Sequence, residues 1–233
     1  MSFQNITCRL ILTEQTKDSV RFSWILVAFM LFFIPSIAIA QESHYTLQTF
    51  LPLSLRDAKI IHVGLVLETT IPSTKIEAVK SAIVSSDYLT NDGQRLYKGW
   101  QGALSNLGNQ PGLVVPQKFD ISESKDKFDK IIIKLTNKKN PNGYNGYTNS
   151  VSQTNYEVLQ SSITIYDINS LNNNEISEIV RHEFGHALGL GHSTVPYDLM
   201  NPDIYMENSY VSFCDIAGIR AVYNGHIQSH IYC

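Results

Sequence analysis

An α+β domain, a sandwich of helices on one mixed sheet, is the fold class that the sequence predicts. Strand-like and helix-like segments follow one another along residues 57–225 in the order strand, helix, strands, helix, helix. The 233 residues are 43% hydrophobic and 17% charged, which supplies enough apolar material for one core and fits a single domain. The formal net charge of -3 argues against a nucleic-acid partner, because phosphate binding needs clustered Lys and Arg.

The first half of this domain is expected to contribute strands and helices. Residues 59–68 are apolar and β-branched, which predicts a buried strand. Apolar residues recur every three or four positions over 72–89, which predicts a helix, and 96–108 is expected to continue as a second helix or a helical loop. Short apolar runs predict further strands at 112–119 and 130–136.

The second half begins with a polar segment. Residues 137–155 are rich in Asn, Gly and Ser, which predicts an exposed loop. Residues 161–168 alternate between apolar and polar and predict a strand, and 212–224 has apolar residues at helical spacing.

The clearest helix spans residues 172–191. Asn174 is the expected N-cap, and acidic residues in the first turn favour the positive end of the helix. Gly189 and Gly191 are expected to end the helix.

An uncharged, apolar segment at residues 22–40 precedes the domain. It ends in Ala38-Ile39-Ala40, a small-x-small pattern typical of a signal-peptidase site, and Pro35 would break a helix just before the cut. The segment is also long enough to cross a bilayer as an uncleaved anchor. Residues 1–40 are therefore expected to be a signal peptide or an N-terminal membrane anchor, with the remainder secreted or held on the outer face of the membrane.

Removal of residues 1–40 would leave two cysteines, Cys214 and Cys233. An even pair in an oxidising compartment suggests a disulfide that ties the C-terminal tail to the last helix. Two alternatives stay open: both thiols could be free, or His226, His230 and Cys233 could form a second metal site.

The chemistry of the chain is concentrated in "RHEFGHALGLGH", residues 181–192. On a helix, His182 and His186 are one turn apart on the same face, so both imidazoles can reach one ion. His192 can join them only if the chain turns sharply, and Gly189 permits the positive φ that such a turn needs. Three nitrogen ligands leave a fourth place for water, which is typical of a catalytic zinc site.

Glu183 is offset from the two helical histidines, where its carboxylate can reach a zinc-activated water without becoming a ligand. As a general base it would take a proton from that water during attack on a peptide carbonyl. H-E-x-x-H alone can arise by chance on an amphipathic helix, but the addition of Gly189 and His192 makes a chance match improbable.

The full pattern H-E-x-x-H-x-x-G-x-x-H followed by a methionine turn resembles the metzincin zinc peptidases. Ser193, directly after the third histidine, is similar to the matrixin branch of that clan. The resemblance implies that Met200 in "YDLMNP" forms a hydrophobic floor under the metal. It also implies that Asp215 in "CDIAGIRAVYNG" hydrogen-bonds the methionine turn.

The same resemblance implies a fold and a substrate path. The fold would be metzincin-like: a mixed twisted sheet, an active-site helix, a methionine turn and a C-terminal helix. An extended protein or peptide substrate would pair with an edge strand at 161–167, and the turn 196–202 would line the pocket for the side chain after the cut. Residues 57–225 would then be the catalytic domain, between a lead-in at 41–56 and a tail at 226–233.

Three features depart from the family pattern. No propeptide with a cysteine that could cap the zinc is recognisable. The segment 137–155 replaces the family's acidic, histidine-bearing loop, so neither Ca²⁺ nor a structural Zn²⁺ is expected beside the one catalytic Zn²⁺. Cys214 stands where the family often has a second acidic residue.

These features together predict a secreted or surface zinc endopeptidase that works as a monomer, with membrane association possible only through residues 22–40. One alternative is a catalytically inactive zinc-containing module that binds partners at the cell surface. A second is a narrow-specificity aminopeptidase, for which the sequence marks no acidic group to hold the substrate's amino terminus.

Overall fold

The computed structural model describes residues 2–10, 45–55, 60–105, 107–123, 129–152, 156–204 and 209–233. The apolar segment 22–40 lies outside these residues, so the choice between a signal peptide and an anchor stays a prediction. Among the described residues, none of the helices combines the length and the apolar character that crossing a membrane requires.

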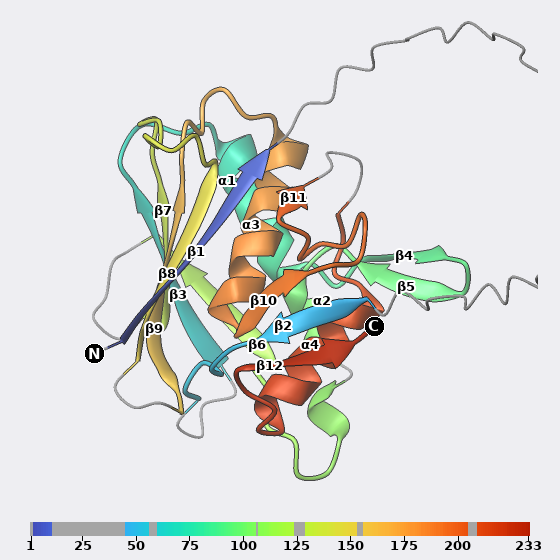
Figure 1. The fold of residues 1–233 in the computed structure, drawn as a ribbon. Coiled ribbons are helices and arrows are strands. Elements are labelled where there is room, and N and C mark those ends of the chain that lie inside the picture. The colour runs from blue at the N-terminus through green and yellow to red at the C-terminus, as the bar shows by residue number, and fades with distance from the viewer. Residues whose placement is uncertain are drawn as a thin grey trace, which may run out of the picture.

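A seven-stranded mixed sheet forms one layer of the molecule, in the order β11-β1-β8-β9-β7-β3-β6 (Figure 1). β3, β6, β7 and β9 run parallel, whereas β8 is antiparallel to β9. Its strands are β1 Ser2–Leu10, β3 Ile60–Leu67, β6 Lys118–Ser122, β7 Ile131–Leu135, β8 Gly146–Ser152, β9 Val158–Ile165 and β11 Asp203–Ile204. The predicted α+β class with one mixed sheet is confirmed.

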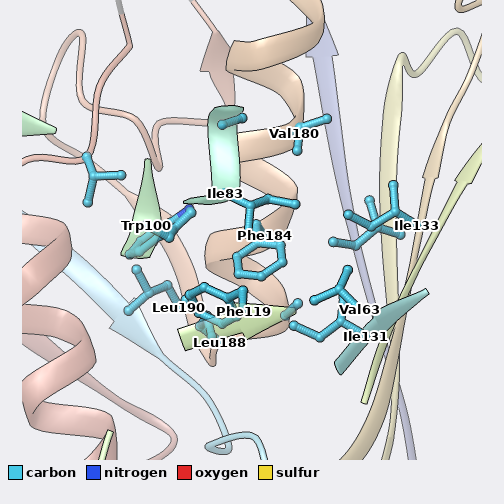
Figure 2. Packing of buried hydrophobic residues seen from close by; sticks show 14 of the residues in the cluster. Val63, Ile83, Trp100, Phe119, Ile131, Ile133, Val180, Phe184, Leu188 and Leu190 are labelled. Atoms are coloured by element: carbon cyan, nitrogen blue, oxygen red, sulfur yellow. The ribbon is translucent and has the colours of Figure 1, made fainter. Parts of the chain in front are cut away.

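Helices α1 (Ser73–Val84) and α3 (Asn173–Ala187) cover one face of this sheet (Figure 1). Strand β7 alternates between buried and half-buried residues, so that Ile131 and Ile133 face the helices. Phe184 of α3 lies between those isoleucines and Trp100 (Figure 2), and its ring meets Phe119 edge-on at 5.0 Å. A fully buried aromatic residue of this kind contributes about 3–5 kcal/mol to stability, so this contact fixes α3 on the sheet.

A second, three-stranded sheet has the order β10-β2-β12. Its strands are β2 Thr46–Thr49, β10 Leu190–Ser193 and β12 Ser229–Tyr232. Helix α4 (Phe213–Tyr223) packs against it, and a disulfide joins Cys214 of α4 to Cys233. The lead-in and the tail are thus both strands of one small sheet, which the sequence pattern did not indicate.

The expected loop at 137–155 is wrong, because β8 occupies residues 146–152. This strand is built mostly from Thr, Asn, Ser and Tyr, a composition that resembles a loop, but its backbone groups are paired with β9. The placement of 161–167 at a sheet edge is therefore also wrong: β9 pairs with β7 on one side and with β8 on the other.

Two helix predictions also need correction. Helix α1 ends at Val84, and a hairpin of β4 (Tyr88–Asn91) and β5 (Gln94–Tyr97) follows it. Asp92 and Gly93 at its tip have φ of 48° and 77°, the conformation that a two-residue hairpin turn requires. Only the end of the predicted 96–108 helix is helical, as α2 (Trp100–Ser105) and the short turn η1 (Leu107–Asn109).

The strand expected at 112–119 is displaced, since β6 runs from Lys118 to Ser122. Helix α3 begins two residues earlier than expected: its N-cap is Asn172, whose side chain accepts hydrogen bonds from the amides of Asn174 and Glu175. The Glu175 carboxylate accepts in return from the Asn172 amide at 2.6 Å, which completes a capping box.

Candidate metal centre

Helix α3 places His182, Glu183 and His186 in the interior of the molecule. The first two are fully buried and His186 is 3% exposed. All three side chains lie in the C-terminal half of the helix, which packs on β8 and β9. The backbone of β8 comes very close, since a Cβ atom at Gly146 would lie 2.5 Å from Glu183 Oε1.

Gly189 turns the chain from α3 into β10, as its position in the sequence predicted. Its φ is 106°, and a Cβ atom there would lie 2.7 Å from the carbonyl oxygen of Leu51. Both the backbone conformation and the lack of space therefore require glycine.

His192 follows on β10, at an irregularity in the pairing of β10 with β2. The paired residues are Leu190 with Thr49 and Ser193 with Leu47, so the register shifts between them. Such a bulge re-aims a side chain, and here the half-buried His192 turns toward the two helical histidines.

The three imidazoles converge. Their candidate ligand atoms all lie within 4.8 Å of one another, and the ring centroids are 4.6 Å (His182 to His186), 5.0 Å (His186 to His192) and 5.6 Å (His182 to His192) apart. The sequence prediction that these three residues meet agrees with this geometry.

Backbone carbonyls fix the orientation of both helical histidines. His182 Nδ1 lies 2.6 Å from the Leu199 carbonyl oxygen, and His186 Nδ1 lies 2.9 Å from that of Leu190. Because a carbonyl only accepts, each Nδ1 carries the proton and donates, which leaves Nε2 with a free lone pair. The Nε2 atoms of His182, His186 and His192 are buried and have no hydrogen-bond partner among the described residues. Three orphaned imidazole nitrogens fit a divalent metal, and an all-nitrogen set with one place left over is typical of catalytic zinc.

Burial keeps these histidines neutral, which is the form that binds a metal. It lowers the pKa of His182 to about 3, with a smaller contribution from His192. Burial and the neighbouring histidines hold the pKa of His186 well below its usual range, and burial lowers the pKa of His192 as well.

The Glu183 carboxylate is held on one side only. Oε2 accepts a hydrogen bond from the Thr148 hydroxyl at 2.5 Å, whereas Oε1 is buried without a partner among the described residues. Burial raises the pKa of Glu183 to about 8, against the opposing effect of the Thr148 hydrogen bond. A cation held by the histidines would favour the ionised carboxylate.

Part of the chain that holds this cluster is similar to a known protein family. The model of the matrixin family matches residues 117–224, which include all three histidines and Glu183. Residues 117–224, just under half of the chain, are therefore similar to the matrixin family. The α+β fold agrees with this similarity.

Two known proteins are similar to parts of this chain. The hatching enzyme of Paracentrotus lividus is 46% identical over 54 residues, which are 22% of this chain and 9% of that protein. Matrix metalloproteinase-20 of Homo sapiens is 48% identical over 48 residues, 19% of this chain and 10% of that protein. Each match thus spans about a tenth of the relative's own length.

Met200 lies directly against α3 and is fully buried. A Cβ atom at Gly185 would be 2.5 Å from Met200 Sδ and 3.0 Å from Trp100, so the glycine inside the H-E-x-x-H motif gives these side chains room. The Met200 carbonyl accepts from the Ser193 amide at 2.8 Å, which connects the methionine turn to β10.

Two buried carboxyl groups support the methionine turn. Asp198 Oδ1 accepts from the Met200 amide at 3.1 Å, and its Oδ2 accepts from the Ser212 hydroxyl at 2.7 Å. Asp215 bonds the Ser212 amide at 2.8 Å, and burial together with Asp198 holds its pKa well above the usual range. Asp198, which the sequence did not single out, thus bonds the Met200 amide directly. Asp215 caps α4 and reaches the turn through its side-chain interaction with Asp198.

Arg181 is a second site neighbour that sequence reasoning missed. It precedes His182, is 6% exposed, donates to the Ser209 carbonyl and lies 5.1 Å from the centroid of the Tyr210 ring. The sequence could have indicated Arg181, because a charged residue on the apolar side of a helix is rarely buried without a partner. Arg181 thus connects α3 to Ser209 and Tyr210.

β1 lies between β8 and β11 in the large sheet (Figure 1). β1 is antiparallel to β8 from Ser2 to Cys8 and parallel to β11 at Arg9 and Leu10. The strand that borders the centre is therefore β8, not residues 161–167.

Proposed function

We propose that this chain is a zinc-dependent endopeptidase that hydrolyses peptide bonds within exported or surface proteins. The observation that carries the proposal is the convergence of three buried, unpartnered Nε2 atoms next to an unpartnered carboxylate oxygen of Glu183. A purely structural metal site has no need of a buried base beside it.

His182, His186 and His192 would hold the metal. When bound, Zn²⁺ supplies a Lewis acid that polarises a carbonyl and lowers the pKa of a bound water. Glu183 Oε1 accepts the proton from the attacking water and later delivers it to the leaving amine. Met200 forms the apolar floor, Gly189 sets the turn to His192, and Asp215 caps α4 beside the methionine turn.

The substrate lies as an extended strand along β8. Support comes from β1, which occupies this path with β-type hydrogen bonding to strands on both sides. A strand that runs past the centre in both directions fits cleavage inside a chain better than removal of one terminal residue.

Export is proposed from residues 22–40 together with the disulfide between Cys214 and Cys233. Disulfides persist in oxidising compartments outside the cytoplasm. The chain would be secreted or held on the outer membrane face.

The test uses the purified, zinc-loaded protein with casein and a peptide library, with and without a chelator. We expect chelator-sensitive cleavage within peptides, and loss of that cleavage in Glu183→Gln with zinc still bound. Zinc binding without cleavage by the wild type would favour the alternative of an inactive surface module. Retained activity in Glu183→Gln would refute the role of that residue.

A further inference from the structure

We propose that Thr148 is a positioning residue for Glu183, a role that rests on the proposed peptidase function. Thr148 holds one carboxylate oxygen so that the other is presented to the reacting water. Thr148 lies on β8, far from the histidine motif in the sequence, and its side-chain hydrogen bonds go to Glu183.

The contact is short and buried. Thr148 Oγ1 lies 2.5 Å from Glu183 Oε2 and 3.1 Å from the backbone carbonyl oxygen of Glu183. Thr148 is 1% exposed and Glu183 is fully buried, so water does not compete for these groups. Oε1 is the oxygen left without a hydrogen bond among the described residues.

The hydroxyl is itself well fixed. Thr148 is paired with Ile163 of β9 inside the sheet, and a β-branched side chain is stiff at χ1. The terminal torsion of a glutamate is soft by comparison, because rotation about an sp³–sp² bond has broad minima. Thr148 therefore supplies the orientation that the Glu183 side chain lacks.

The opposite oxygen is packed against Gly146 and has no hydrogen-bond partner among the described residues. A Cβ atom at Gly146, two residues before Thr148, would lie 2.5 Å from Oε1 and 2.8 Å from Cγ of Glu183. The two oxygens therefore have different neighbours on β8. Thr148 donates a hydrogen bond to Oε2, and Gly146, which has no Cβ atom, makes room for Oε1. A base must be aligned with the proton that it accepts, so a loss of this alignment reduces the rate more than it reduces binding.

The experiment compares Thr148→Val, which keeps the branched shape and removes the hydroxyl, with Thr148→Ser, which keeps the hydroxyl. Ser150→Ala is the matched control: Ser150 lies two residues along β8, and its hydroxyl contacts Ser161 at 2.8 Å instead of Glu183. For the zinc-loaded protein we expect kcat of Thr148→Val to fall roughly 10- to 100-fold with KM unchanged, as for other outer partners of a metal site. Thr148→Ser should restore most of the rate, and Ser150→Ala should leave it unchanged.

A second readout does not depend on activity. In the metal-free protein, a double-mutant cycle of Thr148→Val and Glu183→Met, which removes both carboxylate oxygens, measures the free energy of unfolding. Each single change leaves the other buried group without its partner, so the double variant should be less destabilised than the sum of the singles. If Thr148→Val does not fold, Thr148→Ala takes its place in both measurements.

The outcomes separate the two claims. Suppose that the wild type is active and Glu183→Gln is inactive. If Thr148→Val then keeps its kcat, or changes only KM, the role of Thr148 alone is overturned. Additive effects in the cycle would also overturn it. A zinc-loaded wild type that cleaves nothing would overturn the peptidase function and the role of Thr148 with it.

Discussion

His182 and His186 come from one turn of a 15-residue helix, whereas His192 comes from a four-residue strand. The helical pair is fully or almost fully buried, and both Nδ1 atoms are fixed by carbonyls. His192 is half-buried and sits at a bulge. The spacing of the first pair is set locally by the helix, but the place of the third ligand depends on segments far away in the chain.

Those distant segments pair with one another and hold β10, which carries His192, in place. β10 pairs with β2, β2 pairs with β12, and the disulfide of Cys214 and Cys233 ties the end of β12 to α4. The Thr46 amide also donates to the Thr194 hydroxyl at 2.8 Å, just after β10. The helix alone sets the spacing of His182 and His186, whereas the position of His192 depends on the packing of the whole fold.

The largest effect is expected from removal of a ligand on either side. His186→Ala and His192→Ala should each weaken zinc binding by more than about 100-fold, beyond the effect typical of outer partners. Competition with a chelator of known affinity measures both. Full zinc occupancy in His192→Ala would break the proposed ligand set.

Acid should act on the metal-free protein through its buried histidines. The pKa of His182 is about 3 in the folded state against 6.5 ordinarily, so between these pH values the unfolded chain binds a proton that the folded chain refuses. Stability is therefore lost as the pH falls through this window, by about 1.4 kcal/mol per pH unit for this histidine. Glu183 and Asp215, whose pKa values are raised, act in the opposite direction.

Urea unfolding of the metal-free wild type and of His182→Gln, between pH 6.5 and 4.5, measures the free energy of unfolding of each protein. The difference between the two reports on His182, because Glu183 and Asp215 are present in both. The slope of stability against pH should be smaller in the variant by roughly the same 1.4 kcal/mol per unit. Equal slopes in the two proteins would contradict the assignment.

The next test concerns the turn at Gly189, which joins α3 to β10. Gly189→Ala should cost about 1–3 kcal/mol of stability because of its positive φ, and the blocked space at Leu51 should displace His192 and weaken zinc binding about 10-fold. Gly143→Ala is the control, since Gly143 has φ of 77° but open space around it. Equal zinc affinity in the two variants would show that the turn does not set the ligand.

The smallest effect on zinc affinity is expected from loss of the disulfide between Cys214 and Cys233. Cys214→Ser with Cys233→Ser opens a link between residues 19 apart, which should cost about 2–4 kcal/mol of stability. Zinc affinity should fall only a few-fold, because β2 still pairs with β10. An affinity loss as large as that of His192→Ala would mean that β12, rather than the bulge, places this ligand.

The same division explains what the sequence could predict. Helical spacing of His182 and His186, and the need for a glycine at 189, follow from local geometry and agree with the structure. The resemblance to metzincins drew attention to Met200 and Asp215, both of which lie at the methionine turn. Local patterns carry this information because neighbours along the helix are also neighbours in space.

The features that were missed depend on pairing between distant segments. β8 was taken for a loop because its Thr, Asn and Ser residues lack an apolar alternation, and Thr148 was hidden with it. Strands β2 and β12 are four residues each and gain their pairing from each other and from β10. Besides its bond to the Met200 amide, Asp198 accepts from Ser212, fourteen residues away, and no local pattern reveals that contact.

X-ray absorption at the zinc edge of the loaded wild-type protein tests the central claim most directly. The account predicts three imidazole nitrogens at about 2.0–2.1 Å and one light oxygen ligand. A spectrum with only two imidazoles, or with sulfur bound to the metal, would contradict the convergence of His182, His186 and His192 on one ion.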